Sequence, residues 1–323
     1  STFFMKQHTF VVTDAYLQAA PSARLDIFLC AMLADAVSRA QIANHIKEGQ
    51  VTVSGKEARK PSQLLRVDEV VTYQESIAAP YAVTPQEVEF EVIAEEPDFL
   101  VINKPAGLIV HHSETAPEAV TLVHGLLHRY PAFAAFDAQE RAGIVHRLDK
   151  DTSGLLLVAR TPRALTKLAE LFQERAIHKT YYALVHGHPS EQGEVAQPIG
   201  RHPVHRYKMT IGGIAPRPAH THYAVVSYLE DHSLLRLNPT TGRTHQLRVH
   251  CHYLGHPLVG DAVYGKASID IKRQALHAAS LEFEYAGKAY AFSAPLPPDF
   301  RRCFQRLAVG KSVQECDLVL QNI

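Results

Sequence analysis

The order of strand-like and helix-like segments between residues 87 and 310 constrains the fold of this chain most. Helices are expected at few places there, among them a helix from Pro162 to Arg175 that Thr161 caps. Apolar runs predict a larger number of strands, at residues 100–102, 144–148, 155–159, 181–185, 223–228 and 234–237. Because helices do not follow the strands in regular alternation, the pattern favours an α+β fold over a doubly wound parallel sheet. We expect a mixed, largely antiparallel sheet with helices on its faces.

A smaller unit precedes this sheet. Apolar residues over 25–33 recur with helical spacing, a second helix is expected to end at Gly49, and residues 51–55 read as a strand followed by a turn. The length of 323 residues is enough for about two domains. We therefore divide the chain into an N-terminal extension (1–20), a small α/β module (21–76), a linker (77–86), a large domain (87–310) and a C-terminal tail (311–323).

The small module is locally basic although the whole chain has a formal net charge of zero. Residues 39–66 contain six Lys or Arg and two acidic residues. A charge run is most often a solvated surface, but a concentration on one helix end and the following hairpin also suits contact with a phosphate backbone. Arg39, Lys47 and Lys56 are the candidates for such contact. Residues 21–75 resemble the S4 RNA-binding domain, which implies that the module binds structured RNA.

The sequence also predicts where the protein works. Its longest apolar stretch, residues 27–34, is far shorter than the roughly 20 residues of a membrane helix. The first 20 residues lack the apolar region of a secretory signal, so we expect a cytoplasmic protein without a membrane span. The four cysteines form no CxxC pair, and reduced thiols are expected at Cys30, Cys251, Cys303 and Cys316.

A polar turn between two apolar runs is the most informative segment for function. Residues 149–154 separate the expected strands 144–148 and 155–159, and Arg147 and Asp149 would leave the same face of the first strand if it continued to Asp149. An aspartate at the end of a strand is often a turn residue that bonds its own backbone. It is also where a rigid scaffold presents a reactive group to a substrate.

Five sequence blocks resemble the RluA-type pseudouridine synthases. The most specific is HRLDKDTSG, which contains Asp149 and is similar to the family signature HRLDxxTSG. The other four blocks follow the order of the family, and they are residues 103–111 (NKPAGLIVH), 179–185 (KTYYALV), 241–250 (TGRTHQLRVH) and 256–265 (HPLVGDAVYG). The resemblance implies a pseudouridine synthase fold and the isomerisation of uridine to pseudouridine in RNA, with no cofactor and no metal.

The resemblance assigns the chemistry to Asp149. Its carboxylate would act either as a nucleophile toward the sugar or as a base at the neighbouring sugar carbon, and the sequence leaves both open. A cation is expected beside it, because burial alone would disfavour the charged carboxylate. Arg243 is the candidate for this ion pair, and Arg248 is the alternative.

Three further residues take roles from the same resemblance. Tyr181 is expected to lie against the uracil ring after the nucleotide has flipped out of its stack, and Leu258 to pack on the other side of the base. Arg147 is expected to fill the gap that the extruded nucleotide leaves and to hold phosphate. All three would contact substrate.

A second basic segment lies in the large domain. Residues 199–222 contain four Lys or Arg and no acidic residue, and Arg201, Arg206 and Lys208 are candidates for RNA binding. The segment is similar to that of family members that modify 23S ribosomal RNA of the large subunit. The expected partner is therefore large-subunit ribosomal RNA or its precursor, bound by a monomer, while another RNA target is the alternative.

Other readings compete with this one. Asp149 and Asp151 could be the carboxylate pair of a glycoside hydrolase, because residues two apart on a strand lie roughly 7 Å apart. A non-catalytic RNA-binding protein is a further alternative. His252 and His256 could be imagined as metal ligands, but they lack the acidic residue of an HExxH motif.

Overall fold

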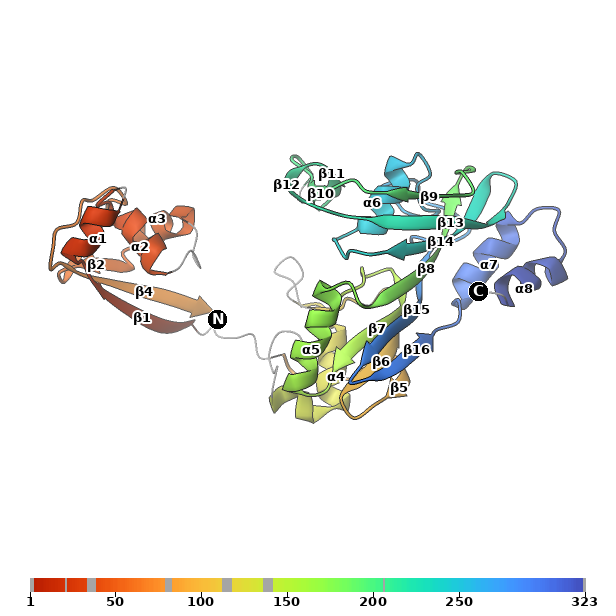
Figure 1. The fold of residues 1–323 in the computed structure, drawn as a ribbon, viewed down its shortest axis with the longest axis horizontal. Coiled ribbons are helices and arrows are strands. Elements are labelled where there is room, and N and C mark those ends of the chain that lie inside the picture. Colours follow the sequence, from red (N-terminus) through yellow and green to blue (C-terminus); the bar gives the residue numbers. More distant parts are fainter. Residues whose placement is uncertain are drawn as a thin grey trace. The chain divides into compact units, whose positions relative to one another are not determined.

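The computed structural model describes residues 3–20, 22–33, 39–78, 83–111, 118–135, 142–205 and 207–321. The chain separates into two compact units, Ser1–Ala82 and Val83–Ile323 (Figure 1). Each unit has its own buried core. Every helix in the described ranges is too short or too polar to cross a bilayer.

The first unit is a four-stranded antiparallel sheet with helices packed on it. The strands β1 (Phe3–Val11), β2 (Val51–Val53), β3 (Lys56–Glu57) and β4 (Val70–Ala78) lie in the order β1-β4-β2-β3. Its helices are α1 (Asp14–Ala19), α2 (Leu25–Met32) and α3 (Arg39–Lys47). The apolar faces of α2 and α3 supply Leu25, Phe28, Leu29, Ile42 and Ile46 to the core, as their helical spacing requires.

The N-terminal segment is not an extension, which corrects the expected division of the chain. Residues 3–11 pair with residues 70–78 along their full length, and the next residue, Val12, is fully buried in the core of the unit. Strand β1 is therefore part of the sheet. The expected linker is also shorter, because β4 continues to Ala78; residues 79–82 lie outside the described residues.

The second unit is built on a nine-stranded mixed sheet. Eight strands form the path β5-β6-β7-β15-β8-β14-β13-β9, and β16 pairs with β15. The pair β7–β15 is parallel and the other pairs are antiparallel. The strands are β5 (Glu91–Glu95), β6 (Phe99–Lys104), β7 (Ser153–Ala159), β8 (His178–His186), β9 (Gln192–Val195), β13 (Thr221–Tyr228), β14 (His232–Pro239), β15 (Leu276–Tyr285) and β16 (Lys288–Ser293). The predicted α+β fold is confirmed.

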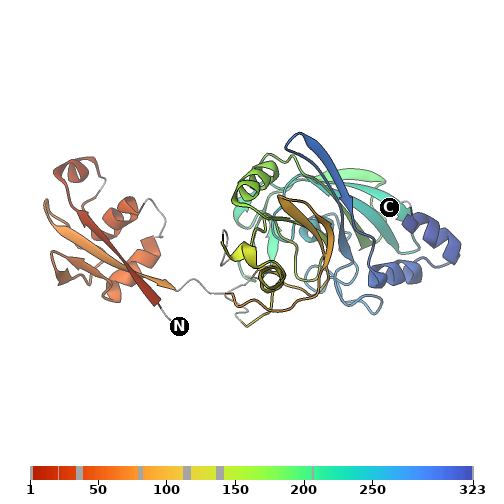
Figure 2. The same cartoon turned by 90° about the horizontal axis from the view of Figure 1, so that it is seen from below.

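Helices cover both faces of this sheet because its strands alternate between two buried faces. One face packs on α4 (Leu122–Arg129) and α6 (Gln246–Tyr253), and includes Leu156 and Ala183. The other face packs on α5 (Pro162–Gln173) near Leu157, and on α7 (Pro298–Leu307) and α8 (Val313–Gln321) near Leu184. Figure 2 shows α5 and the α7–α8 pair at opposite ends of the unit.

Small elements complete the unit. A 3-10 helix, η1 (Pro131–Ala135), follows α4. A separate three-stranded sheet of β10 (Ile199–Arg201), β11 (Met209–Ile211) and β12 (Ile214–Arg217) lies in the order β11-β10-β12. The expected tail also differs, because α8 buries Cys316 and Leu320 in the core of the unit.

Candidate active site

Asp149 lies on an irregular loop just before β7, where the sequence had suggested the end of a strand. Residues 144–148 make one isolated bridge, Ile144 to Val158, and form no strand. Ile144 and Leu148 are nevertheless buried, so the apolar run reflects packing and not extended pairing. The loop then turns, with the Thr152 amide donating to the Asp149 carbonyl over 3.1 Å.

A buried lysine fixes this loop from one side. Lys104 is completely buried, and its Nζ donates to the carbonyl oxygens of Pro105, Leu108 and Lys150 over 2.8 to 2.9 Å. The amide of Gly107 donates to the same Lys150 carbonyl over 2.9 Å. Burial lowers the pKa of Lys104 to about 7. All three protons of the ammonium have acceptors, so the lysine ties two loops together.

A histidine and an arginine fix the loop at its two ends. The amide of Leu157 donates to Nε2 of His146 over 2.8 Å, and the His146 ring stacks on Phe172. Burial lowers the pKa of His146 to about 3, so its ring is neutral. At the other end, Arg273 donates to the Asp151 carbonyl over 3.1 Å. Asp149 is thus held on a rigid support, as a reactive group requires.

The ion pair with Asp149 is made by Arg248. One guanidinium nitrogen of Arg248 lies 3.2 Å from Oδ2 of Asp149. The expectation that Arg243 makes this pair is wrong, because Nε of Arg243 donates to the Pro218 carbonyl over 2.9 Å. The difference follows from the helix start: α6 begins at Gln246, so Arg248 lies in its buried first turns while Arg243 lies in the preceding loop.

A second carboxylate fixes the direction of the Arg248 side chain. Asp261 accepts from Nε and Nη2 of Arg248 over 2.7 and 2.9 Å, in the paired geometry that orients a guanidinium. Asp261 also accepts from the amides of Val263 and Tyr264. Its side chain is completely buried, whereas that of Asp149 is 17% exposed. The inner carboxylate therefore orients the arginine, and the outer one meets the solvent-accessible space.

The charged side chains of Arg248 and Asp261 stabilise one another. Burial alone would disfavour the Arg248 cation, but hydrogen bonds and attraction from Asp261 and Asp149 raise its pKa. Burial likewise opposes the charge of Asp261, and the hydrogen bonds from Arg248 and two backbone amides lower its pKa. Both groups of the inner pair are therefore charged at neutral pH.

His245 approaches the same carboxylate oxygen of Asp149 as Arg248 does. Its Nε2 is 4.0 Å from Oδ2 of Asp149, and its Nδ1 is within 2.8 Å of the Tyr264 hydroxyl. Burial lowers the pKa of His245, and the charge of Asp149 opposes this effect. The Tyr264 ring also lies under the guanidinium of Arg248, 5.0 Å from its centre. His245 thus contacts Asp149, and Tyr264 contacts both His245 and Arg248.

A cavity of about 320 Å³ opens beside Asp149, within the usual range for small-molecule sites. Arg147, Tyr181, Arg243 and Arg248 line it together with Asp149. The structure therefore brings together all four residues that the sequence had predicted as catalytic, although Arg243 does not contact the carboxylate. Burial, and then the charge of Asp149, raise the pKa of Tyr181, so its phenol stays protonated.

One expected substrate contact, and one residue of the glycoside hydrolase alternative, lie outside this cavity. Leu258 is fully buried, bridges to Val185 in the sheet and is absent from the described lining of the cavity, so the expected contact with the base is not supported. Asp151 likewise lies outside that lining and joins Asp149 in a neighbouring cavity. Asp149 and Asp151, the carboxylate pair of the glycoside hydrolase hypothesis, therefore do not both line the cavity that contains Tyr181.

The expected RNA-binding residues are distributed over both units. In the first unit, Lys47 and Lys56 are exposed, and Arg39 makes an ion pair of 2.9 Å with the buried Asp26. In the second unit, Arg201 is exposed at the end of β10 and Lys208 is half-buried near it. Arg206 lies outside the described residues.

Sequence reasoning assigned no role to Lys104, His245 or Asp261. Each of them lies inside one of the five motif blocks, so position in a block was an available signal. The position of Asp261 shortly after an apolar run is a further signal, because an acidic residue that is buried there needs a partner for its charge.

Comparisons with known proteins show which sequences and structures this chain is similar to. The family model described as RNA pseudouridylate synthase matches residues 98–253, and the S4 domain model matches residues 23–71. A protein named ribosomal large subunit pseudouridine synthase D from Vibrio parahaemolyticus is 38% identical over 90% of this chain and 92% of its own length. The protein of that name from Escherichia coli K12 is 40% identical over 85% of this chain and 88% of its own length.

Solved structures give the same result. The structure titled human RNA pseudouridylate synthase domain containing 1 has a TM-score of 0.53 and 28% identity, and the match covers 76% of this chain and 98% of that one. The structure titled human RNA pseudouridylate synthase domain containing 4 has a TM-score of 0.57 and 26% identity, over 67% and 92% of the two chains.

Proposed function

The chain belongs to the RNA pseudouridylate synthase family, and from this premise we propose that it isomerises uridine to pseudouridine in large-subunit ribosomal RNA, with Asp149 as the catalytic carboxylate. The observation that carries the proposal is the position of Asp149. Its carboxylate is paired with Arg248, partly exposed, and on the wall of a cavity that also contains Tyr181.

Asp149 has the features that this reaction demands of a carboxylate. The reaction breaks the bond between the sugar and the base nitrogen and forms a bond to a base carbon, with no net redox change. Whether the carboxylate attacks the sugar or removes a proton from the neighbouring carbon, it must be ionised and must reach the ribose. Arg248 donates to the Asp149 carboxylate over 3.2 Å, and Asp149 lines the cavity in which a ribose can reach it.

Tyr181 and Arg147 are placed in the proposal as substrate contacts. The Tyr181 ring offers an apolar face in the cavity on which a flipped uracil can stack. Arg147 is exposed and lines the same cavity, where its charge can hold phosphate and offset part of the few kcal/mol that base flipping costs. Arg248 acts through Asp149 and is therefore a positioning residue.

The first unit supports an RNA substrate with a defined fold. Its match to the S4 domain model and its exposed basic side chains suit binding to structured RNA. The relatives named above carry ribosomal large subunit in their names. We infer that this protein acts on the same class of RNA, as a monomer and in the cytoplasm, and that Arg201 and Lys208 contribute to binding.

The test compares unmodified transcripts as substrates. Large-subunit ribosomal RNA, small-subunit ribosomal RNA and transfer RNA are incubated separately with the protein, and pseudouridine is mapped by its carbodiimide adducts. The expected result is pseudouridine at discrete positions of the large-subunit transcript alone. Modification confined to another transcript would overturn the substrate and keep the reaction, whereas a lack of pseudouridine in every transcript would overturn both.

A further inference from the structure

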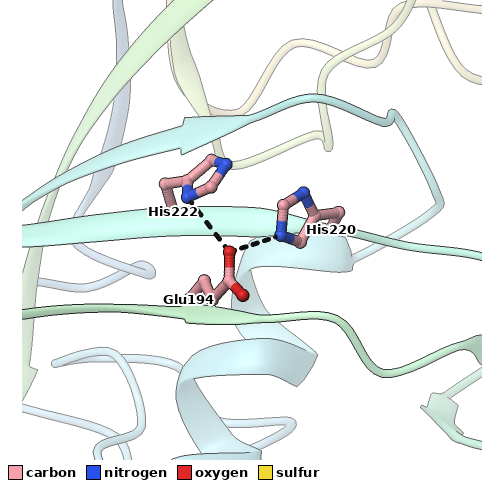
Figure 3. Close-up of side chains that lie close together, drawn as sticks. All are labelled: Glu194, His220 and His222. Atoms are coloured by element: carbon pink, nitrogen blue, oxygen red, sulfur yellow. Dashed lines mark hydrogen bonds and ion pairs between the residues drawn. The ribbon is translucent and has the colours of Figure 1, made fainter.

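Two histidines and a glutamate converge on the outer surface of the second unit, apart from the residues around Asp149. Oε2 of Glu194 is 3.0 Å from Nε2 of His220 and 3.5 Å from Nδ1 of His222 (Figure 3). The two imidazole rings lie 4.4 Å apart between their centres and are nearly perpendicular. Within the described residues, this is the single group of three or more potential ligand side chains whose donor atoms lie close together.

The backbone explains why these side chains meet. Glu194 on β9 is directly opposite His222 on β13 in the antiparallel register. Thr221, the first residue of β13, is buried, whereas His222 after it is exposed and His220 just before the strand is partly exposed. Donor atoms from β9, from β13 and from the residue before β13 therefore lie within 4.8 Å of one another at the surface.

We propose that Glu194, His220 and His222 form a binding site for a divalent cation of the zinc class. Two imidazoles and one carboxylate are a donor set that Zn²⁺, Co²⁺ and Ni²⁺ accept, whereas Mg²⁺ and Ca²⁺ prefer oxygen donors alone. Bonds of about 2.0 to 2.2 Å place the ligand atoms of such an ion roughly 3 to 3.5 Å apart. The donor atoms here lie within 4.8 Å of one another, so small side-chain rotations complete the geometry.

Neighbouring residues hold the first histidine in position. Its Nδ1 lies 3.4 Å from the Thr240 hydroxyl, which leaves Nε2 directed toward Glu194. Its main chain is also fixed, because the His220 amide donates to Thr241 and the His220 carbonyl accepts from Gln246. Metal-binding histidines usually have such partners, which orient the ring and select the nitrogen that binds.

The same hydrogen bonds connect the cation site with the active-site cavity. Gln246 is the first residue of α6, and its side chain joins the His220 carbonyl to the Arg243 amide in the cavity wall. An ion on His220 would therefore restrain the loop from Thr240 to His245. The proposed chemistry at Asp149 uses no metal, so this ion would be an addition to it.

The test uses the full chain without a polyhistidine tag. Co²⁺ is titrated while its visible absorption is followed, and Zn²⁺ binding is measured by calorimetry. One ion per chain is expected, with Glu194→Gln and His222→Ala each weakening binding at least about tenfold, because even the loss of an outer partner costs that much. The matched control is His205→Ala, which removes the exposed member of the His202–His205 pair outside the site and should leave binding unchanged.

A second readout separates this site from adventitious binding. Zn²⁺ should slow amide hydrogen exchange over residues 219–223 and 240–246 in the wild type and not in Glu194→Gln. Binding that survives both site substitutions, or that His205→Ala abolishes, would overturn the proposal. The absence of stoichiometric binding in the wild type would overturn it as well.

Discussion

Replacing Arg248 with methionine should destabilise the second unit far more than the same substitution at Arg243. Arg248 donates three hydrogen bonds to two carboxylates, and the Asp261 side chain beneath it is completely buried. Removing one partner of a buried ion pair leaves an uncompensated charge and costs about 3 to 5 kcal/mol. Arg243 is half-buried and donates from Nε to one carbonyl, so its loss should cost about 0.5 to 1.5 kcal/mol.

Urea unfolding followed by far-ultraviolet circular dichroism measures both free energies. The chain contains no tryptophan, so intrinsic tryptophan fluorescence offers no signal. The two units are fitted as separate transitions, and the substitution at Arg248 should shift the transition of the second unit alone. A loss at Arg243→Met equal to or larger than that at Arg248→Met would refute the assignment of the ion pair.

Activity gives an independent check on the same residue. Arg248→Lys keeps a positive charge but lacks the planar fork that reaches Asp149 and Asp261 together. Asp149 would then lose its fixed orientation, and misplacement by about 1 Å costs roughly 100-fold in rate. The single-turnover rate of pseudouridine formation should fall by that order while RNA affinity is retained. An unchanged rate would mean that Arg248 does not position Asp149.

Three further predictions concern the pH response, the sheet and RNA binding. Burial lowers the pKa of Lys104 to about 7 from its ordinary 10.5, so between these pH values the unfolded chain binds a proton that the folded chain has lost. The wild type should therefore gain stability relative to Lys104→Met as the pH rises from 7 to 9, by up to about 1.4 kcal/mol per pH unit. Urea unfolding at several pH values measures this, and a wild type that gained no stability relative to Lys104→Met would count against it. Gly154→Ala should destabilise the second unit by at least about 2 kcal/mol in the same assay, since φ at Gly154 is +116° and a Cβ there would overlap the Ala278 carbonyl; a neutral substitution would contradict the close pairing of β7 with β15. Lys208→Gln should lower the slope of log affinity against log salt by about 1, and an unchanged slope would exclude a phosphate contact.

Local signals in the sequence predicted the elements whose cause is local. Helix α5 begins where Thr161 and Pro162 mark it, and the Thr161 hydroxyl accepts from the Ala164 amide over 3.1 Å. The apolar run at 144–148 misled the prediction, because burial of Ile144 and Leu148 in a loop leaves the same pattern as a buried strand. Strand β1 was missed because its partner residues on β4 lie about 60 to 75 positions away in sequence.

In the candidate site, too, the features with a local cause were predicted and those that depend on distant contacts were not. The motif around Asp149 identified the carboxylate, because the residues of this block are adjacent in sequence. The choice between Arg243 and Arg248 depended on where α6 begins, and His245 sets that point with a left-handed backbone, φ 56°. The anchoring role of Asp261 requires contact across 13 residues, which spacing alone does not reveal.

The most direct test of the central claim is a single-turnover assay of Asp149→Asn on large-subunit ribosomal RNA, beside the matched variant Asp151→Asn. The wild type and Asp151→Asn should form pseudouridine at comparable rates, because the Asp151 side chain is outside the cavity that holds Tyr181. Asp149→Asn should bind the RNA with unchanged affinity and lose at least about 10⁴-fold in rate, the order seen when a reacting group is removed. Pseudouridine formation by Asp149→Asn at the wild-type rate would contradict the account.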